Sequence, residues 1–286
     1  MNYIMDSFLM IGQSNMAGRG FLNEVKPIFN LDINVLVNGR WQAMWEPINP
    51  DRPTSGVGLA ASFAAAWSLE NPGKKIGLIP CAEGGSSLED WSVGGVLYEN
   101  ALFQANLAQR SSKLQGIIWH QGENDSFLGR SADYGKRLSK LIAALRKQIG
   151  DQSTPFICGG LGDYLSKGRY GQYFTEYKLV NEALLTLSNQ TDNCFFVTAS
   201  ELKANPDDLH FDALSQRKFG LRYFDAFHLK QNILEAGPDE AQRLETIDNR
   251  RLTRAEQIAL SEIDFGSGKL SVEEYEKQLL VFKQSE

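Results

Sequence analysis

The sequence has few cysteines, few histidines and no long apolar run. Its 286 residues contain three cysteines, which lie far apart and each within or beside a short apolar stretch. An odd number of scattered cysteines argues against a disulfide framework, so we expect Cys81, Cys158 and Cys194 to be reduced core residues. No apolar stretch approaches the roughly 20 residues that a membrane-spanning helix needs, and no membrane partner is therefore expected.

The chain also lacks an excess of positive charge. Its 29 lysines and arginines against 35 aspartates and glutamates give a net charge of −6. This balance argues against nucleic acid as a partner, because a polyanion would be repelled. The opening residues, MNYIMDS, carry neither a basic segment nor the apolar stretch of a signal peptide. We expect a cytoplasmic protein, or a secreted one if a leader has been removed.

Short apolar runs alternate along the chain with longer segments of helical spacing. This alternation is typical of parallel strands that helices cover on both faces. It predicts an α/β protein, a three-layer α/β/α sandwich with a mostly parallel sheet of about five strands. Residues Ile33–Val37 interrupt the alternation, and we interpret them as a short hairpin beside the first crossover. The predicted strands contain Phe8–Gly12, Ile76–Cys81, Gly116–His120, Pro155–Gly160 and Cys194–Ser200.

The last fifty residues differ in character from the rest. They are charged, and Thr253-x-x-Glu256 and Ser271-x-x-Glu274 each resemble a capping box that opens a short helix. Apolar residues are too few here to form a separate core. We therefore expect a main domain over residues 1–235 and a helical appendage over residues 236–286, which docks on the main domain or forms a homo-oligomer with a second subunit.

Polar, glycine-rich segments follow three of the predicted strands, where an open α/β sheet binds its ligands. Ser14 lies in the first of them, and a serine there is either a helix cap or a nucleophile. A nucleophilic serine needs a base. Among three histidines, His210 is the best candidate, because Asp207 three residues earlier could orient its ring. The alternative is that Asp207 or Asp208 caps the following helix.

Two further segments could hold a developing oxyanion. Gly84 and Gly85 allow the backbone to approach a ligand closely, and Gln121 and Asn124 could each donate a side-chain N–H. A zinc site formed by His120, Glu123, Asp207 and His210 is a weaker alternative, because it leaves Ser14 and the glycine pair without a task.

The order of these segments resembles the SGNH (GDSL-like) hydrolase superfamily. GQSNMAGRG, PCAEGGSSLEDW and IIWHQGEND, followed by Asp-x-x-His-Phe, are similar to its carbohydrate-esterase branch, which holds acetylxylan esterases of carbohydrate esterase family six and sialate O-acetylesterase-like proteins. The resemblance covers Phe8 to Phe227. It implies a flavodoxin-like fold, no cofactor and no metal.

The resemblance also implies residue roles. Ser14 would be the nucleophile, His210 the base and then the acid, and Asp207 its orienting partner. The backbone N–H groups of Ser14 and Gly85 would form part of the oxyanion hole. Gln121 is the favoured amide donor, with Asn124 second, and Glu123 either anchors its loop or touches the substrate.

The function that follows is a serine esterase that removes O-acetyl groups from a carbohydrate through an acetyl-enzyme on Ser14. One alternative is a lipase- or thioesterase-like hydrolase of other acyl esters, and another is a catalytically silent carbohydrate-binding relative. Trp45, Trp91 and Tyr98 are candidates either for sugar stacking or for the core. The sequence leaves open which sugar and which acetyl position are served.

Overall fold

Seven strands form one sheet in the order β3-β2-β4-β1-β5-β6-β7 in the computed structural model, which describes residues 5–284. Six strands run parallel, and only β3 runs antiparallel to its neighbour. The α/β prediction is confirmed. The strands are β1 (Met5–Gly12), β2 (Ile33–Val37), β3 (Arg40–Ala43), β4 (Lys75–Pro80), β5 (Lys113–His120), β6 (Phe156–Gly159) and β7 (Cys194–Val197).

The sheet is wider than the predicted five strands because the interrupting segment joins it. Ile33–Val37 does form a hairpin with the next strand, as predicted. It also pairs in parallel with β4, with Val35 opposite Leu78. Ile33 and Val35 are buried in the main core, so the hairpin forms one edge of the sheet.

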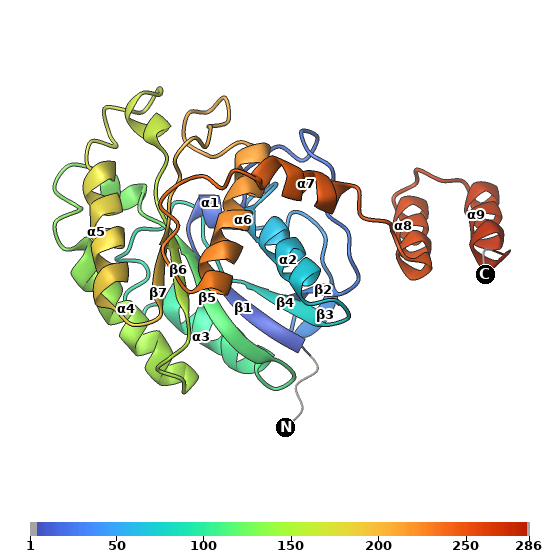
Figure 1. Ribbon diagram of the computed structural model, residues 1–286, viewed down its shortest axis with the longest axis horizontal. Helices are drawn as coiled ribbons and strands as arrows, with labels where there is room; N and C mark the ends of the chain where they lie inside the picture. The colour runs from blue at the N-terminus through green and yellow to red at the C-terminus, as the bar shows by residue number, and fades with distance from the viewer. Residues whose placement is uncertain (1–4, 285–286) are drawn as a thin grey trace.

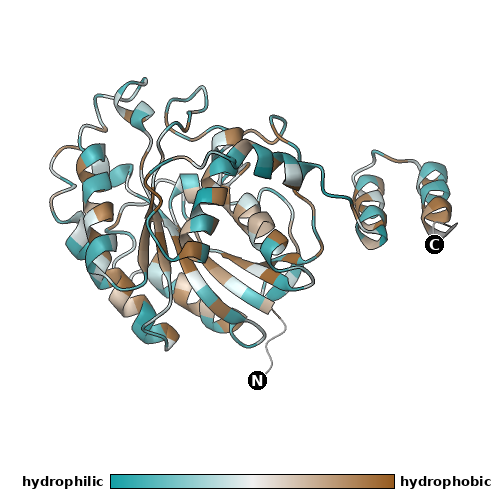
Figure 2. Ribbon diagram, viewed as in Figure 1, coloured by the Kyte–Doolittle hydropathy of each residue, from teal (hydrophilic) through white to brown (hydrophobic). Residues whose placement is uncertain are grey.

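Helices cover both faces of the sheet (Figure 1). Alternate residues of β1 enter the two layers: Phe8 and Met10 pack toward α2 and α6, whereas Leu9 and Ile11 pack toward α3, α4 and α5. Figure 2 shows apolar residues gathered on the central strands. The helices of the body are α1 (Ser14–Ala17), α2 (Leu59–Glu70), α3 (Val96–Ala108), α4 (Tyr134–Ile149), α5 (Tyr177–Gln190), α6 (Ala213–Leu229) and two 3₁₀ turns, η1 (Asn124–Ser126) and η2 (Asp163–Ser166).

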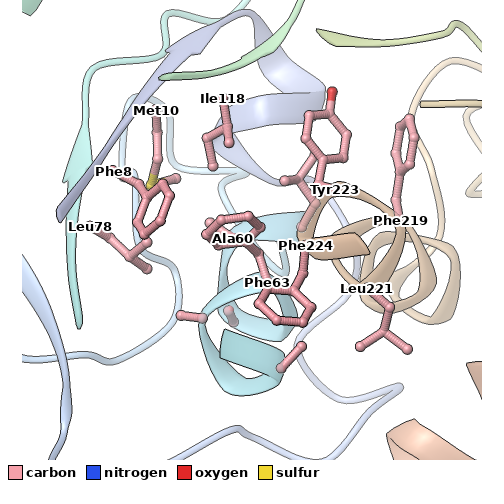
Figure 3. Packing of buried hydrophobic residues seen from close by; sticks show 14 of the residues in the cluster. Phe8, Met10, Ala60, Phe63, Leu78, Ile118, Phe219, Leu221, Tyr223 and Phe224 are labelled. Atoms are coloured by element: carbon pink, nitrogen blue, oxygen red, sulfur yellow. The ribbon is translucent and has the colours of Figure 1, made fainter. Parts of the chain in front are cut away.

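Close packing of α2 against α6 fixes one layer of the core. A Cβ on Gly220 of α6 would lie 2.1 Å from the carbonyl oxygen of Leu59, so only glycine allows this approach. Phe63 of α2 then reaches Phe8 of β1, with ring centroids 4.8 Å apart and the rings edge to face (Figure 3). Helix α6, which follows the predicted histidine turn, is thereby held firmly against the sheet.

Strand β1 lies between β4 and β5, so its carboxyl end is central. Gly12 ends the strand with φ +135°, and a Cβ there would lie 2.0 Å from the carbonyl oxygen of His120. The same carbonyl accepts the N–H of Gln13 at 2.9 Å. Glycine therefore allows the chain to turn tightly over the end of β5 and to place Ser14 at the rim of the sheet.

The C-terminal segment divides into a packed helix and a projecting hairpin. Leu244 and Ile247 of α7 (Glu240–Asp248) are buried in the main core, and Glu240 pairs with the buried Arg222 of α6. Helices α8 (Arg254–Gly266) and α9 (Val272–Gln284) project from one side of the body in Figure 1, and the first turn of α8 contacts the body through Oε1 of Glu256, which accepts the N–H of Leu31 at 3.1 Å. Because α7 packs as part of the body, we propose that the appendage begins near residue 251, later than the predicted boundary after residue 235.

Both predicted capping boxes are present in the structure. Thr253 and Glu256 form a capping box at the start of α8, and Ser271 and Glu274 exchange the equivalent bonds before α9. All three cysteines are buried and free. Between residues 5 and 284, no helix is both long and apolar enough to cross a membrane.

Candidate active site

Ser14, His210 and Asp207 form a hydrogen-bonded chain at the carboxyl end of β1. Nε2 of His210 lies 2.9 Å from Oγ of Ser14, and Nδ1 lies 2.6 Å from Oδ2 of Asp207. With the Nδ1 proton donated to the carboxylate, Nε2 keeps a lone pair that can accept the serine proton. The three residues thus have the geometry of a nucleophile, a general base and an orienting acid.

The competing helix-cap interpretations find no support at these positions. Ser14 is the first residue of α1, and its hydroxyl faces His210. Asp212, not Asp207 or Asp208, caps α6 by accepting the N–H of Ser215 at 2.7 Å. Ser14 and Asp207 therefore have their side chains available for the chain of hydrogen bonds to His210.

A tight turn brings the carboxylate of Asp207 next to Nδ1 of His210. Its Oδ1 accepts the backbone N–H groups of Leu209 and His210, both at 2.9 Å, which leaves Oδ2 for the imidazole. Asp208 allows the turn by adopting φ +58°. The N–H of Asn205 closes the turn on the carbonyl of His210 at 2.7 Å.

The carboxylate of Asp207 is held in its ionised form. Burial alone would raise its pKa, but the hydrogen bonds from His210 and from the backbone outweigh burial and lower the pKa to about 2. Asp207 thus stays negative at every pH at which a histidine base could work, and it can stabilise the imidazolium that forms when Ser14 loses its proton.

Two backbone N–H groups near the serine are free to bind an oxyanion. Those of Ser14 and Gly85 have no acceptor among the described residues. Gly85 adopts φ +79°, a conformation that favours glycine, and a Cβ built there would meet nothing within 4 Å. Both N–H groups are therefore available for the roles predicted for them, which stay predictions.

A buried ion pair holds the glycine loop. Oδ2 of Asp51 accepts the N–H of Gly84 at 2.8 Å and pairs with Arg19 at 2.7 Å. Burial would raise the pKa of Asp51, yet Arg19 and the other donors lower it. The side-chain amide of Asn49 donates to the carbonyl of Ala82 at 3.0 Å and accepts the N–H of Ala82 at 2.9 Å. The loop that presents Gly85 is therefore fixed before any substrate binds.

The side-chain amide of Gln121 is not free, and this corrects the favoured prediction. Gln121 is fully buried. Its Nε2 donates to the carbonyl of Ser86 at 3.2 Å and to Asp125 at 2.6 Å, while its Oε1 accepts the hydroxyl of Tyr134 at 3.1 Å. Both N–H groups already have acceptors, so neither is left for an oxyanion.

Asn124 and Gln13 each retain an N–H group without an acceptor among the described residues. Asn124 donates once, to the carbonyl of Gly85 at 2.6 Å, and its Oδ1 accepts Arg130 at 2.5 Å. Sequence reasoning missed Gln13, whose Oε1 accepts the N–H of Gly122 at 3.2 Å and whose Nε2 has no acceptor among residues 5–284. The one available signal was the position of Gln13 directly before the serine.

Glu123 points into the protein interior. Its side chain is buried, accepts the amide of Asn15 in a very short hydrogen bond, and lies 3.3 Å from Nε2 of His120. Burial would raise its pKa, but the charge of His120 and these hydrogen bonds lower it. Of the two predicted roles, the contacts fit loop anchoring.

The residues of the zinc alternative form two separate pairs, and the aromatic candidates pack against other parts of the protein. His120 pairs with Glu123 and His210 with Asp207, and within residues 5–284 no three His, Cys, Asp or Glu side chains cluster as metal ligands. Trp91 and Tyr98 are buried in the core. Trp45 is half exposed and packs against Phe29, in a groove between the body and α8.

Comparison with known proteins gives this geometry a family context. The family described as carbohydrate esterase, sialic acid-specific acetylesterase, matches residues 4–229. A probable carbohydrate esterase of Arabidopsis thaliana is 30% identical over 246 residues, covering 77% of this chain and 89% of that protein.

Solved structures agree on the fold. An Arabidopsis thaliana protein solved by X-ray crystallography has a TM-score of 0.70 at 27% identity and covers 79% of this chain and 98% of its own. A carbohydrate acetylesterase from Xanthomonas citri has a TM-score of 0.56 at 19% identity, covering 78% of this chain and 55% of its own, and at that identity shows the fold alone. The family match over residues 4–229 and the relative that is 30% identical show that the chain belongs to the sialic acid-specific acetylesterase family of carbohydrate esterases.

Proposed function

We propose that this carboxylic ester hydrolase removes O-acetyl groups from a carbohydrate through an acetyl-enzyme on Ser14. The observation that carries the proposal is the chain of contacts from Ser14 to His210 at 2.9 Å and from His210 to Asp207 at 2.6 Å. A catalytically silent binding protein would not need all three side chains in this arrangement.

In the proposed mechanism, His210 takes the proton of Ser14 as its oxygen attacks the acetyl carbonyl. The oxyanion of the tetrahedral intermediate accepts the backbone N–H groups of Ser14 and Gly85 and one side-chain amide. His210 then gives its proton to the sugar oxygen, which leaves as an alcohol. A water molecule, deprotonated by His210, attacks the acetyl-enzyme; the bond to Oγ of Ser14 breaks, His210 returns the proton to that oxygen, and acetate is released. No step requires a cofactor.

Acyl-chain preference separates this function from the lipase- or thioesterase-like alternative. We expect 4-nitrophenyl acetate to be hydrolysed with a higher kcat/KM than 4-nitrophenyl octanoate, measured by release of 4-nitrophenol. Preference for the octanoate ester would favour the alternative, and no activity on esters or acetylated sugars would favour a silent protein. Acetylated xylan fragments compared with O-acetylated sialic acid would then identify the sugar.

The amide donor of the oxyanion hole is proposed to be Gln13 or Asn124. Removing an oxyanion donor typically costs about 10²- to 10³-fold in kcat. We expect Gln13→Ala or Asn124→Ala to show this loss with 4-nitrophenyl acetate, and the variant with the larger loss identifies the main donor. Losses below about threefold in both variants would rule out a side-chain amide donor at these positions.

Association of two chains through α8 and α9 is a further proposal. It is supported by the exposure of Phe265, Val272 and Leu280 on a hairpin that projects from one side of the body. Sedimentation of the full chain would test it.

A further inference from the structure

We propose that Asn15 and Glu123 are positioning residues of the triad, which lock the turn carrying Ser14 to the turn carrying His210. The inference rests on the proposed function, because it assigns the two residues to the same reaction. It concerns a buried network beneath Ser14 in which neither Asn15 nor Glu123 takes part in the proposed proton transfers.

Asn15 joins three segments that are distant in the sequence. It follows Ser14 directly and is buried. Its Oδ1 accepts the N–H of Phe211, the residue after His210, at 3.0 Å, and its Nδ2 donates to Oε1 of Glu123. Its carbonyl also accepts Nε2 of Gln216 in α6 at 3.1 Å. One side chain thus connects the serine turn, the histidine turn and the end of β5.

The amide of Asn15 works in only one orientation. If it were flipped, its NH₂ group would face the N–H of Phe211, and two donors would oppose each other. Glu123 prevents the flip because its ionised carboxylate only accepts hydrogen bonds. Nε2 of His120 lies 3.3 Å from Oε1 of Glu123, the oxygen that accepts the Asn15 amide. Nδ1 of His120 lies 3.3 Å from the hydroxyl of Tyr223.

This network has a cost that a purely structural role does not explain. Glu123 is buried, and its Oε2 has no hydrogen-bond partner among the described residues. A buried charge with an unsatisfied oxygen contributes little to stability compared with apolar packing. The carboxylate does, however, fix the direction of the Asn15 amide and with it the distance between Ser14 and His210.

Asn15→Asp is the sharpest test, because the two side chains have almost the same shape. The new carboxylate still accepts from Phe211, but it faces the carboxylate of Glu123 and repels it. A displacement of about 1 Å at a reacting group can cost about 10²-fold in rate, and we expect a loss of that order in kcat with little change in KM. Asn15→Ala, which removes both contacts without adding charge, should show a loss of similar order.

A second substitution should restore the pair with its polarity reversed. In the double variant Asn15→Asp with Glu123→Gln, the new NH₂ group at position 123 can donate to the carboxylate at position 15. We expect the double variant to recover at least about 10-fold of the activity lost in Asn15→Asp, as a positioned pair requires. Glu240→Gln is the matched control. It weakens the buried ion pair between Glu240 of α7 and Arg222 of α6, and it should leave kcat unchanged.

Two readouts keep this inference separate from the proposed function. One is kcat for 4-nitrophenyl acetate, and the other is the rate at which a fluorophosphonate probe labels Ser14, which needs no acetyl substrate. If the wild type labels quickly but hydrolyses no acetyl ester, the proposed function fails while the labelling rates still test the network.

The labelling rates should follow kcat: slow in Asn15→Asp and Asn15→Ala, and partly restored in the double variant. The proposal would be overturned if Asn15→Ala were labelled at the wild-type rate. It would also be overturned if the double variant were labelled no faster than Asn15→Asp. Loss of the native circular dichroism spectrum in all three Asn15 variants would overturn it as well, because the network would then hold the whole fold.

Discussion

Replacing Ser14 with alanine is expected to lower kcat/KM for 4-nitrophenyl acetate by about 10⁴-fold or more, because removal of a triad nucleophile leaves only binding and the oxyanion hole. Ser14 is the hydroxyl that His210 contacts, at 2.9 Å. Its loss leaves the base without a proton to take and the acyl group without an acceptor. The measurement is release of 4-nitrophenol at saturating and at low ester concentrations.

Ser153→Ala is a suitable control for the serine variant. Ser153 is exposed in the turn before β6, and Asp151 is its one hydrogen-bond partner among the described residues. It should retain wild-type activity. If Ser14→Ala were within tenfold of the wild type, the nucleophile would have to be another group.

Asp207→Asn is expected to cost about 10⁴-fold in kcat, a loss typical of a triad whose orienting acid becomes an amide. The carboxylate accepts the Nδ1 proton of His210 at 2.6 Å. An amide can instead present its NH₂ group, which favours the tautomer with the proton on Nε2. That nitrogen can then no longer accept the proton of Ser14. Asp208→Asn, one residue away, is the matched control and should change kcat little.

The pH profile provides a second readout for the same pair. Because the pKa of Asp207 is lowered to about 2, its stabilising contact with His210 is complete above the ordinary carboxyl pKa of about 4. The contact is lost only as the pH falls toward 2. A decline in kcat/KM between pH 8 and pH 5 would therefore not come from Asp207, and it would instead report on the base that accepts the proton of Ser14. A flat profile over that range would contradict the role of His210.

The features that could be predicted from the sequence depend on local spacing and chain order. Apolar runs that alternate with helices predict the parallel sheet. The three-residue interval between Asp207 and His210 lies within one turn, so the structure brings the pair together as expected. Ser14 was predictable as a candidate because it follows the first strand of an α/β pattern.

Features that depend on distant partners were predicted less well. The amide of Gln121 is occupied by Asp125 and by Tyr134 of α4, and no spacing rule reveals that. Gln13 is oriented by the N–H of Gly122, 109 positions away. Helix α7 packs against α6 partly because Glu240 pairs with Arg222, a contact that the charged composition of the segment does not reveal.

The central claim is that the acetyl group is transferred from the ester to Ser14 before water releases it as acetate. The most direct measurement is to mix the enzyme with excess 4-nitrophenyl acetate, quench in acid within the first turnovers and locate the added acetyl group by mass spectrometry of peptides. We predict acetylation of the peptide that contains Ser14 in the wild type, and none at that position in Ser14→Ala. Rapid ester hydrolysis by the wild type with no acetyl group on Ser14, together with full activity in Ser14→Ala, would contradict it.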